Sequence, residues 1–492
     1  MTAQTILPAN SVTDAYEVAN SLRFNSGSSD YLNLTAAGNS TLSTKGTWST
    51  WVKKSTISSS RGALFSGYAD ASNRVYMVIN ADALTVFGKV GGTVRYTVTV
   101  DQHFRDPSAW MNIVVAIDTT QGTAANRVKI YVNGVQVTSL TNGNGDGVEY
   151  PDQNDVIYFA VNGDQQAIGI REDGALLWNG YFSEVVYIDG TQLTPTSFGE
   201  FDEDSGIWKP IKVSGLTFGN NGCYLDFKDS SALGNVVAGR TAVDFTVTNL
   251  TAVDQTTDTC TNNFATLASG LYTSGATFSQ GNLQYQAPGS NPVFGSLTTI
   301  GVDNGKWYAE VKYTAGSNHY LVLGIADEVF ATLSNLGSNT NTDLGKVGAS
   351  LSTQAFAQNS TVAYVVNTGK VRNNNANGDY GSGGGDGDII QIALDRDNRK
   401  VYFGINGTYE ASGDPGAGSN GFDLSSLVTG DTYFIGVTND TGASETIAEF
   451  NFGSPSFAIS SSNADANGIG NFEYAVPSGF FALCTKNLAE FG

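Results

Sequence analysis

The chain has 492 residues, too many for one ordinary domain, and its 40% apolar content is ample for buried cores. Acidic residues outnumber basic ones by 46 to 25, and the net charge of −21 argues against binding to nucleic acid or to an anionic membrane surface. No apolar run approaches the ~18 residues of a membrane span, so no membrane insertion is expected.

The composition favours short strands and tight turns, because 58 glycines accompany many Thr, Val, Tyr and Phe residues. Cys223, Cys260 and Cys484 form no CxxC pattern, so neither a disulfide framework nor a zinc site is expected. A bridge between the first two is conceivable, but assembly in a reducing cytosol favours buried free thiols. Residues 1–20 lack the features of a signal peptide and are interpreted as an N-terminal arm that docks on a partner.

A first domain is predicted over residues 21–195, where strand signals recur between turn residues. Asn133 and Gly134 supply the type I′ turn that suits a two-residue hairpin. So many short strands at regular spacing indicate an antiparallel sandwich or jelly roll. The predicted strand segments are 47–54, 62–68, 73–80, 83–90, 93–100, 110–120, 126–140, 155–163, 166–171 and 177–190.

Three phrases of this domain carry a family resemblance: "WMNIVVAIDTT", "NRVKIYVNGVQV" and "WNGYFSEVVYIDGTQLTP". They resemble the laminin-G-like, concanavalin A-like lectin/glucanase superfamily over about 170 residues. The resemblance implies a two-sheet jelly roll with a concave face. Members of that superfamily bind sugars, bind proteins or hydrolyse β-glucans, so the fold alone does not choose among these functions.

The stretch "TPTSFGEFDEDSGIWKP" (194–210) places Glu200, Asp202 and Asp204 at alternate positions, which share one face of a strand. Paired carboxylates are the machinery of glycosidases. The stretch resembles the E-x-D-x-x-E or E-x-D-x-E motif of laminarinase-type enzymes, but Asp204 stands where the second Glu should be. Turn residues follow at 205–206, and the stretch lies after the last strand. An acidic connector is therefore favoured, with Trp208 pinning it to a neighbour, and no catalytic residue is assigned.

Residues 196–268 have weak strand signals, apart from "GCYLDF" and "AVDFTVTNL", and are interpreted as a connector. The phrases "TDAYEVANSLRFNSGSSDYL", "SFGEFDEDSGIWKP", "DFTVTNLTAVDQTTDTCTNNFATL" and "PSGFFALCTKNL" resemble, in the same order, structural proteins of tailed phages, especially marine ones. That resemblance implies a place in the virion, assembly in the host cytoplasm, and contacts with other virion proteins through the N-terminal arm. A homo-oligomer is expected, although no coiled-coil heptads are present.

A second domain is predicted over residues 269–456, on five phrases that resemble the SPRY family in order and spacing. The resemblance implies another antiparallel β-sandwich that binds a protein or another ligand through loops on one rim. In "DIIQIALD", Ile390, Ile392 and Leu394 form an apolar face. The five phrases are "GKWYAEVKY" (305–313), "YLVLGIAD" (320–327), "GDIIQIALDRDNRKVYFGINGTY" (387–409), "YFIGVTND" (433–440) and "AEFNFG" (448–453).

Rim loops at 315–320, 328–346 and 371–380 supply candidate ligand contacts in this domain. Polar and aromatic side chains there suit a sugar or a peptide, and the alternative is that they are ordinary exposed loop residues. The candidates are His319, Arg372, Asn374 and Tyr380.

A metal site is not predicted. Asp395, Asp397 and Asn398 offer oxygen ligands of the kind that calcium prefers, but the further ligands of an EF-hand are missing and a hairpin turn explains them better. His103 and His319 are the two histidines of the chain and lie in different domains, so neither a multi-histidine site nor a Ser-His-Asp triad is supported.

The sequence thus predicts an all-β protein of two tandem antiparallel β-sandwiches, a concanavalin A-like jelly roll followed by a SPRY-like sandwich, joined by a connector. Residues 457–492 are interpreted as a tail that packs back through Phe472, Tyr474 and Phe480. The functional hypothesis is a non-enzymatic virion protein without a cofactor, serving as a tail fibre or host-surface adhesin that binds a glycan or protein of the host. The alternatives are a capsid decoration protein and, in another class, a polysaccharide-cleaving glycosidase acting through Glu200 and Asp202.

Overall fold

The computed structural model of the chain contains two compact units, Val12–Thr261 (the first unit) and Asn262–Gly492 (the second unit). Each is described by itself. No helix in the described part of the chain has the length and apolarity needed to cross a membrane. The residues that the structure describes are 16–36, 38–57, 61–144, 147–171, 174–240, 243–269, 276–287, 295–314, 321–327, 361–373, 376–425, 431–439 and 445–492.

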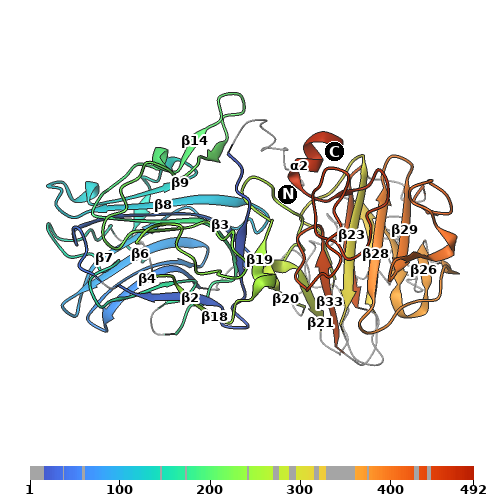
Figure 1. Cartoon of the computed structure of the whole chain (residues 1–492), viewed down its shortest axis with the longest axis horizontal. Helices are drawn as coiled ribbons and strands as arrows, with labels where there is room; N and C mark the ends of the chain where they lie inside the picture. The colour runs from blue at the N-terminus through green and yellow to red at the C-terminus, as the bar shows by residue number, and fades with distance from the viewer. Residues whose placement is uncertain are drawn as a thin grey trace. The chain divides into compact units, whose positions relative to one another are not determined.

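The first unit contains two stacked antiparallel sheets, here called sheets A and B (Figure 1). Sheet A has the order β10 (Val135–Gln136), β9 (Val128–Val132), β8 (Trp110–Asp118), β3 (Lys45–Lys54), β13 (Gly180–Asp189), β1 (Ser21–Phe24) and β19 (Gln255–Thr256), with β16 (Cys223–Leu225) on β13 and β17 (Ala238–Gly239) on β16. Sheet B has the order β11 (Leu140–Thr141), β7 (Thr93–Val100), β6 (Ala83–Val90), β5 (Asn73–Asn80), β4 (Gly62–Asp70), β12 (Gln165–Ile168), β2 (Tyr31–Thr35) and β18 (Thr246–Thr248).

The core of the first unit lies between these two sheets. Alternate residues of each strand point inward, so Ile113 and Val115 of sheet A meet Val75 and Met77 of sheet B in one buried cluster. Trp48 is fully buried in the same cluster. This is the two-layer packing that an antiparallel β-sandwich requires.

Residues 196–261 belong to the first unit, which differs from the predicted connector. This segment contributes β16, β17, β18 and β19 to sheets A and B, and a separate hairpin of β14 (Gly199–Phe201) and β15 (Trp208–Pro210). The buried ring of Trp208 packs on the turn at Gly134, where an added Cβ would lie 2.2 Å from the ring. The segment covers one face of sheet A, so its short strands gain stability from burial that the sequence pattern does not reveal.

The strand predicted at 155–163 is wrong, because these residues form turns. Ile157 and Phe159 are nevertheless buried in the core of the first unit, and Phe159 contacts Phe65 edge to face at 5.5 Å. Alternating apolar residues indicate that a segment is buried, but they do not show that it forms a strand. Here the buried segment is irregular and crosses the end of the sandwich.

The second unit also contains two sheets, here called C and D. Sheet C has the order β20 (Thr277–Ser279), β21 (Gln284–Ala287), β33 (Thr446–Asn451), β23 (Lys306–Tyr313), β28 (Ile389–Asp395), β29 (Lys400–Ile405) and β30 (Thr408–Tyr409), with β31 (Phe422–Asp423) on β29 and β34 (Phe481–Ala482) parallel to β23. Sheet D has the order β22 (Gly295–Leu297), β32 (Tyr433–Asn439), β24 (Leu321–Asp327), β25 (Thr361–Val365), β26 (Lys370–Asn373) and β27 (Ala376–Asp379).

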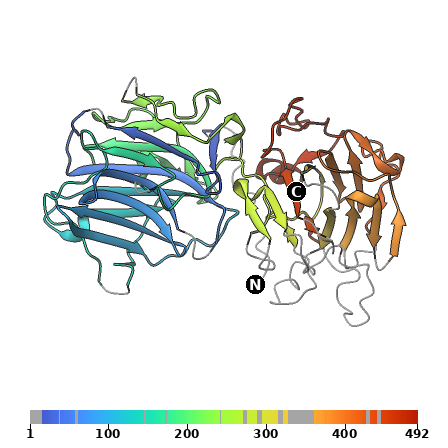
Figure 2. The ribbon, with the colours of Figure 1, turned by 90° about the horizontal axis from the view of Figure 1, so that it is seen from below.

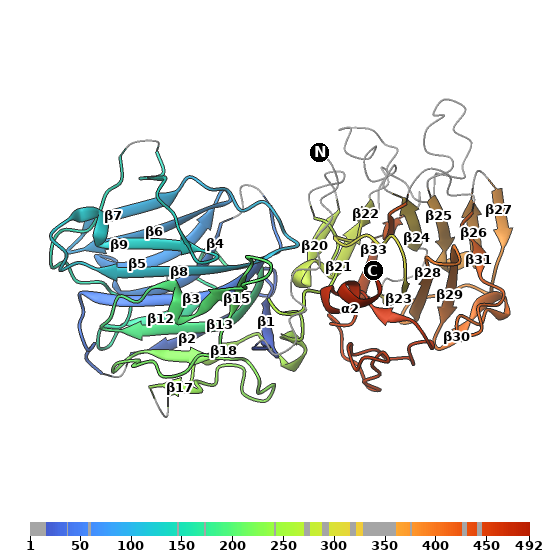
Figure 3. The same cartoon turned by 90° about the horizontal axis from the view of Figure 1, so that it is seen from above.

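Helical segments are short in both units. The structure has one α-helix, α2 (Thr485–Phe491), within the described residues, and Figure 3 shows it beside β23. The 3₁₀ turns are Ala124–Asn126, Pro195–Ser197, Ala252–Asp254, Gln280–Asn282, Val366–Thr368 and Glu410–Ser412.

Both faces of sheet C are buried. One face meets sheet D, and there Ile390, Ile392 and Leu394 are buried as the alternation predicted. The other face is covered by the C-terminal segment 457–492, which runs along one side of the second unit (Figure 2). Phe472 and Phe480 of this segment are fully buried in one cluster with residues of sheet C.

Candidate functional site

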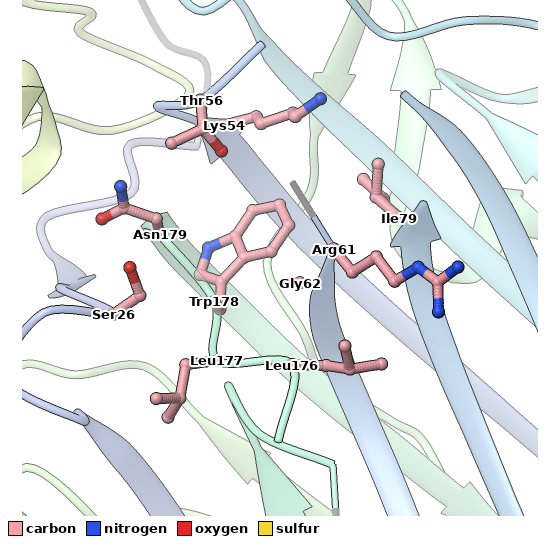
Figure 4. A pocket seen from close by; sticks show the side chains of 10 residues that line it. All are labelled: Ser26, Lys54, Thr56, Arg61, Gly62, Ile79, Leu176, Leu177, Trp178 and Asn179. Carbon is pink, nitrogen blue, oxygen red and sulfur yellow. The ribbon is translucent and has the colours of Figure 1, made fainter. Parts of the chain in front are cut away.

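The first unit carries a pocket of about 430 Å³ at one end of its sandwich. It forms where β3 ends, β4 begins and β5 ends, and where the chain enters β13. Figure 4 shows Trp178 in its middle, with Ser26, Asn179 and Leu177 on one side and Ile79 and Arg61 on the other. The lining residues are Ser26, Lys54, Thr56, Arg61, Gly62, Ile79, Leu176, Leu177, Trp178 and Asn179.

Backbone hydrogen bonds hold the segment before β13 in place. The Ala63 amide donates to the Leu176 carbonyl at 2.7 Å, and the Ser55 amide donates to the Asn179 carbonyl at 3.1 Å. Gly62 is required for close packing, because a Cβ there would lie 2.8 Å from the indole ring of Trp178. The pocket floor is therefore built by the ends of β3 and β4 and is fixed independently of any ligand.

The two cations at the pocket differ in their electrostatic surroundings. Lys54 is buried and forms an ion pair with the buried Asp82, so its charge is compensated inside the protein. Arg61 is exposed, and its Nε donates to Asn80 Oδ1 at 2.8 Å. No carboxylate is found among the described residues that line the pocket, and Arg61 is an exposed cation there.

Two polar atoms of the pocket residues have no protein partner among the described residues: the indole Nε1 of Trp178 and the side-chain Oδ1 of Asn179. Trp178 is only 2% exposed, so its N–H is shielded from bulk water. A buried polar group without a hydrogen bond costs about 1–3 kcal/mol, and both of these atoms are shielded from solvent. No carboxylate pair is found in the described lining of the pocket.

The carboxylates at 200–204 do not form a glycosidase pair in the structure. They lie at the projecting β14–β15 hairpin (Figure 1). Asp202 Oδ1 accepts hydrogen bonds from the Ser205 amide and hydroxyl, both at 2.9 Å, and these lower the pKa of Asp202 to about 2. Glu200 is exposed and pairs with Lys209 at 3.5 Å. A general acid needs a raised carboxyl pKa, and Asp202 has the opposite shift.

The residues predicted for the rim of the second unit are only partly described. His319 and Asn374 lie outside the described residues, while Arg372 is half-buried on β26. The ring of Tyr380 packs against Phe403 and two further aromatic rings, and its hydroxyl accepts a hydrogen bond from the Phe403 amide at 3.4 Å. Burial raises the pKa of Tyr380 to about 12. The ring of Tyr380 therefore has a structural role, and ligand binding by these residues stays a prediction.

The predicted hairpin turn after β28 is present in the structure. Asp395 Oδ1 accepts from the Asn398 amide at 2.9 Å, and Asp397 Oδ1 accepts from the Gly305 amide at 2.7 Å. The β28 and β29 strands pair directly across this turn. In the described part of the chain, no group of three or more His, Cys, Asp or Glu residues is placed to hold a metal ion.

Sequence reasoning missed the pocket residues, and Trp178 in particular. The available signal was a tryptophan followed by Asn179 and Gly180 at the entry to a strong strand. That pattern indicates the start of a strand. It does not indicate which other strands end beside that start. Non-local strand pairing decides this juxtaposition.

Comparison with known proteins places the first unit in a broad class. Residues 26–196 match the family model described as the concanavalin A-like lectin/glucanases superfamily. Comparison with curated protein sequences found no match.

Similar solved structures include SPRY domains and a pentraxin. The SPRY domain of human HERC1 is 14% identical, with 36% of this chain and 91% of that chain covered and a TM-score of 0.25. A human SPRY domain is 16% identical over 36% of this chain and 94% of that chain, with a TM-score of 0.25. The heptameric SAP-like pentraxin of Limulus polyphemus is 16% identical over 37% of this chain and 80% of that chain, with a TM-score of 0.25.

The sheet topology and the family model agree for the first unit. The chain is all-β, with two tandem β-sandwiches, and the first has the concanavalin A-like fold of lectins and glucanases.

Proposed function

We propose that the chain is a structural protein of a tailed-phage virion that adheres to the host surface, and that its first unit binds a host glycan. The observation that carries the glycan-binding part is the pocket at the end of the concanavalin A-like sandwich. The virion part rests on the resemblance of four phrases along the chain to tailed-phage structural proteins. Contacts with other virion proteins through residues 1–20 and a homo-oligomeric state belong to the same proposal.

The pocket suits a sugar in size and chemistry. Its volume of about 430 Å³ lies within the ~300–1,000 Å³ range of small-molecule sites. The half-buried Leu176 and Leu177 offer apolar surface for a sugar ring, while Ser26, Asn179 and Arg61 offer polar atoms for its hydroxyl groups. This mixture of a few polar groups on an apolar wall fixes the orientation of a ligand.

A glycan array probed with the full chain tests the binding proposal. Hits are then measured by calorimetry with the Asn179→Ala and Arg61→Ala variants, and with Gln136→Ala, an exposed residue of β10, as control. We expect specific binding that both pocket variants weaken about tenfold and that the control leaves unchanged. Absence of binding to every glycan on the array and to susceptible host cells would reject the proposal.

Gold-labelled antibody against this chain, applied to intact phage particles, tests where in the virion the protein lies. Label at the tail tip or fibres supports host adhesion. Label spread regularly over the head indicates a capsid decoration protein, with the sandwiches displayed on the capsid. Absence of label from purified particles would contradict a virion protein of either kind.

A further inference from the structure

Arg61 presents an uncompensated cation at one end of the pocket. Its Nε donates to Asn80 Oδ1 at 2.8 Å, which fixes the plane of the guanidinium, and it forms no ion pair with any residue that the structure describes. Lys54, the other cation of the lining, is neutralised by the buried Asp82. The Nη1 and Nη2 groups of Arg61 are therefore left for a ligand that occupies this end of the pocket.

Leu176 supplies apolar surface on the same side of the pocket. Figure 4 shows the side chain of Arg61 extending away from Trp178, on the side where Leu176 lies. Leu176 is half-buried and has a φ of +55°, a conformation that is unfavourable for a bulky side chain. The 2.7 Å hydrogen bond from the Ala63 amide to its carbonyl holds it there. Strained backbone positions of this kind cluster at ligand sites.

The other polar side chains that a ligand can reach in the pocket are able to donate hydrogen bonds. Asn179 buries its Oδ1, so its amide nitrogen is the end of this half-buried side chain that is left for a ligand. The hydroxyls of Ser26 and Thr56 donate as well as accept. Since no carboxylate is found in the described lining, the side chains favour a ligand that has more acceptors than donors.

An anionic sugar substituent has this character. A carboxylate or a sulfate ester only accepts hydrogen bonds, and two of its oxygens match the parallel N–H groups at the Nη end of a guanidinium. A sugar ring that lies on Leu176 would carry such a substituent toward Arg61. On the basis of the glycan binding proposed above, we infer that the pocket selects acidic glycans and that Arg61 determines this selection.

Other sugar substituents fit Arg61 less well. An amine is protonated at neutral pH and would meet a like charge. A hydroxyl is neutral, so its hydrogen bond to Arg61 replaces one to water with little gain. The net charge of −21 repels anions in general, so the selection depends on direct contact with Arg61 and not on long-range attraction.

A glycan array of matched pairs tests this inference on the full chain. Each backbone is present in a neutral form and in a form that carries a carboxylate or a sulfate ester. Every pair that binds is then measured by calorimetry at about 0.15 M salt. We expect the acidic member to bind at least about fivefold more tightly, and the two kinds of pair show which anion is preferred. Equal affinity within the pairs, or tighter binding of the neutral members, would overturn the inference.

Three variants assign the preference to Arg61, whose exposed side chain can be replaced without disturbing the core. Arg61→Gln removes the charge and should reduce the preference to less than about twofold, whereas Arg61→Lys keeps the charge without the paired N–H groups and should be intermediate. Lys212→Gln controls for net charge, because it removes an exposed lysine from the segment that covers the outer face of sheet A. A preference that survives Arg61→Gln, or that Lys212→Gln lowers equally, would overturn the inference.

The outcome also separates this inference from the proposed function. If both members of a pair bind equally and Asn179→Ala weakens both, the glycan-binding proposal stands and the selection of acidic glycans falls. If no glycan binds at all, the proposed function fails and this inference fails with it.

Discussion

Single residues of β3 show how the first unit holds buried charge. Lys53 and Lys54 are neighbours in the sequence, point to opposite faces of the strand, and are both at most 3% exposed. Asp258 compensates the charge of Lys53, and Asp82 compensates the charge of Lys54. Asp258 comes from the segment predicted as a connector, so this ion pair fastens that segment to sheet A.

Replacing Asp258 by Asn should therefore destabilise the first unit strongly. The Lys53 ammonium would stay buried without its carboxylate, which typically costs about 3–5 kcal/mol. The indole N–H of Trp110, which donates to Asp258 at 3.0 Å, would also face an altered partner. Urea unfolding measures the loss.

The exposed pair of Arg95 and Asp152 supplies the matched control. Asp152→Asn removes a similar ion pair at the surface, where screening by water limits the change to about 1 kcal/mol or less. Equal losses of unfolding free energy for the two substitutions would show that burial does not increase the contribution of the Lys53–Asp258 ion pair to stability.

Glu184 is a second buried charge, and it lies in an unusual backbone conformation. Its φ is +50°, at a bulge where the pairing of β13 with β3 shifts register. Its Oε2 accepts hydrogen bonds from the hydroxyls of Tyr224 at 2.7 Å and Tyr16 at 3.3 Å. Burial is the main cause that raises the pKa of Glu184 to about 7.

This shift predicts a pH dependence of stability. In the unfolded chain Glu184 ionises near its ordinary pKa of about 4.5, so the stabilisation present below that pH is lost as the pH rises to about 7. The wild type should lose about 3 kcal/mol of unfolding free energy relative to Glu184→Gln between about pH 4 and pH 8. Parallel stability–pH curves of the two proteins would contradict the assignment.

At the scale of elements, one buried carboxylate attaches the C-terminal segment to sheet C. Glu310 on β23 is fully buried and accepts from the backbone amides of Glu473 at 2.9 Å and Tyr474 at 2.8 Å. It also accepts from the Tyr308 hydroxyl at 3.0 Å and from Asn451 Nδ2 at 3.3 Å. Four donors thus converge on one side chain. Two of them are the backbone amides of 473–474, which have no strand partner there and are satisfied by Glu310 instead.

Glu310→Gln should loosen this segment. A glutamine amide would present a donor where the carboxylate accepts, so at least one buried N–H would lose its partner, at a cost of about 1–3 kcal/mol or more. Hydrogen exchange followed by mass spectrometry should show faster exchange over 470–476. Glu490→Gln, at an exposed hydrogen bond, is the control that should leave this exchange unchanged.

Turns are the elements that the sequence predicted best. Asn133 and Gly134 have φ of 47° and 77° and join β9 to β10 as a two-residue hairpin. Asn406 and Gly407 have φ of 49° and 87° between β29 and β30. The prediction for Asn133 and Gly134 is confirmed, and the same dipeptide forms the turn at 406–407, because positive φ is a local property that Asn and Gly adopt at low cost.

At the scale of the whole molecule, the two units share one feature: each buries its cysteine thiols. Cys223, Cys260 and Cys484 are free and buried, in agreement with the expectation from their spacing. Burial raises the pKa of Cys484 to about 12 and that of Cys223 to about 11, so neither forms the reactive thiolate at neutral pH.

A thiol titration checks this state of the cysteines. The native protein should react with none of its three thiols on the minute scale, and the urea-denatured protein should react with all three without added reductant. Thermal unfolding should be unchanged by reductant. A denatured count of one thiol would indicate a disulfide and contradict the structure.

The all-β class, most of the longer strands and the tight turns could be predicted from the sequence, because alternation and turn chemistry are local. The sequence also predicted that residues 457–492 pack back on the chain, but it did not show that they cover the second face of sheet C or that 196–261 belongs to the first unit, because both depend on contacts between distant segments. The pocket around Trp178 also needed the tertiary structure, because it joins the ends of β3, β4 and β5 to the entry of β13. Strand pairing between distant segments sets which polar atoms meet and which stay unpaired, and no local pattern records that choice.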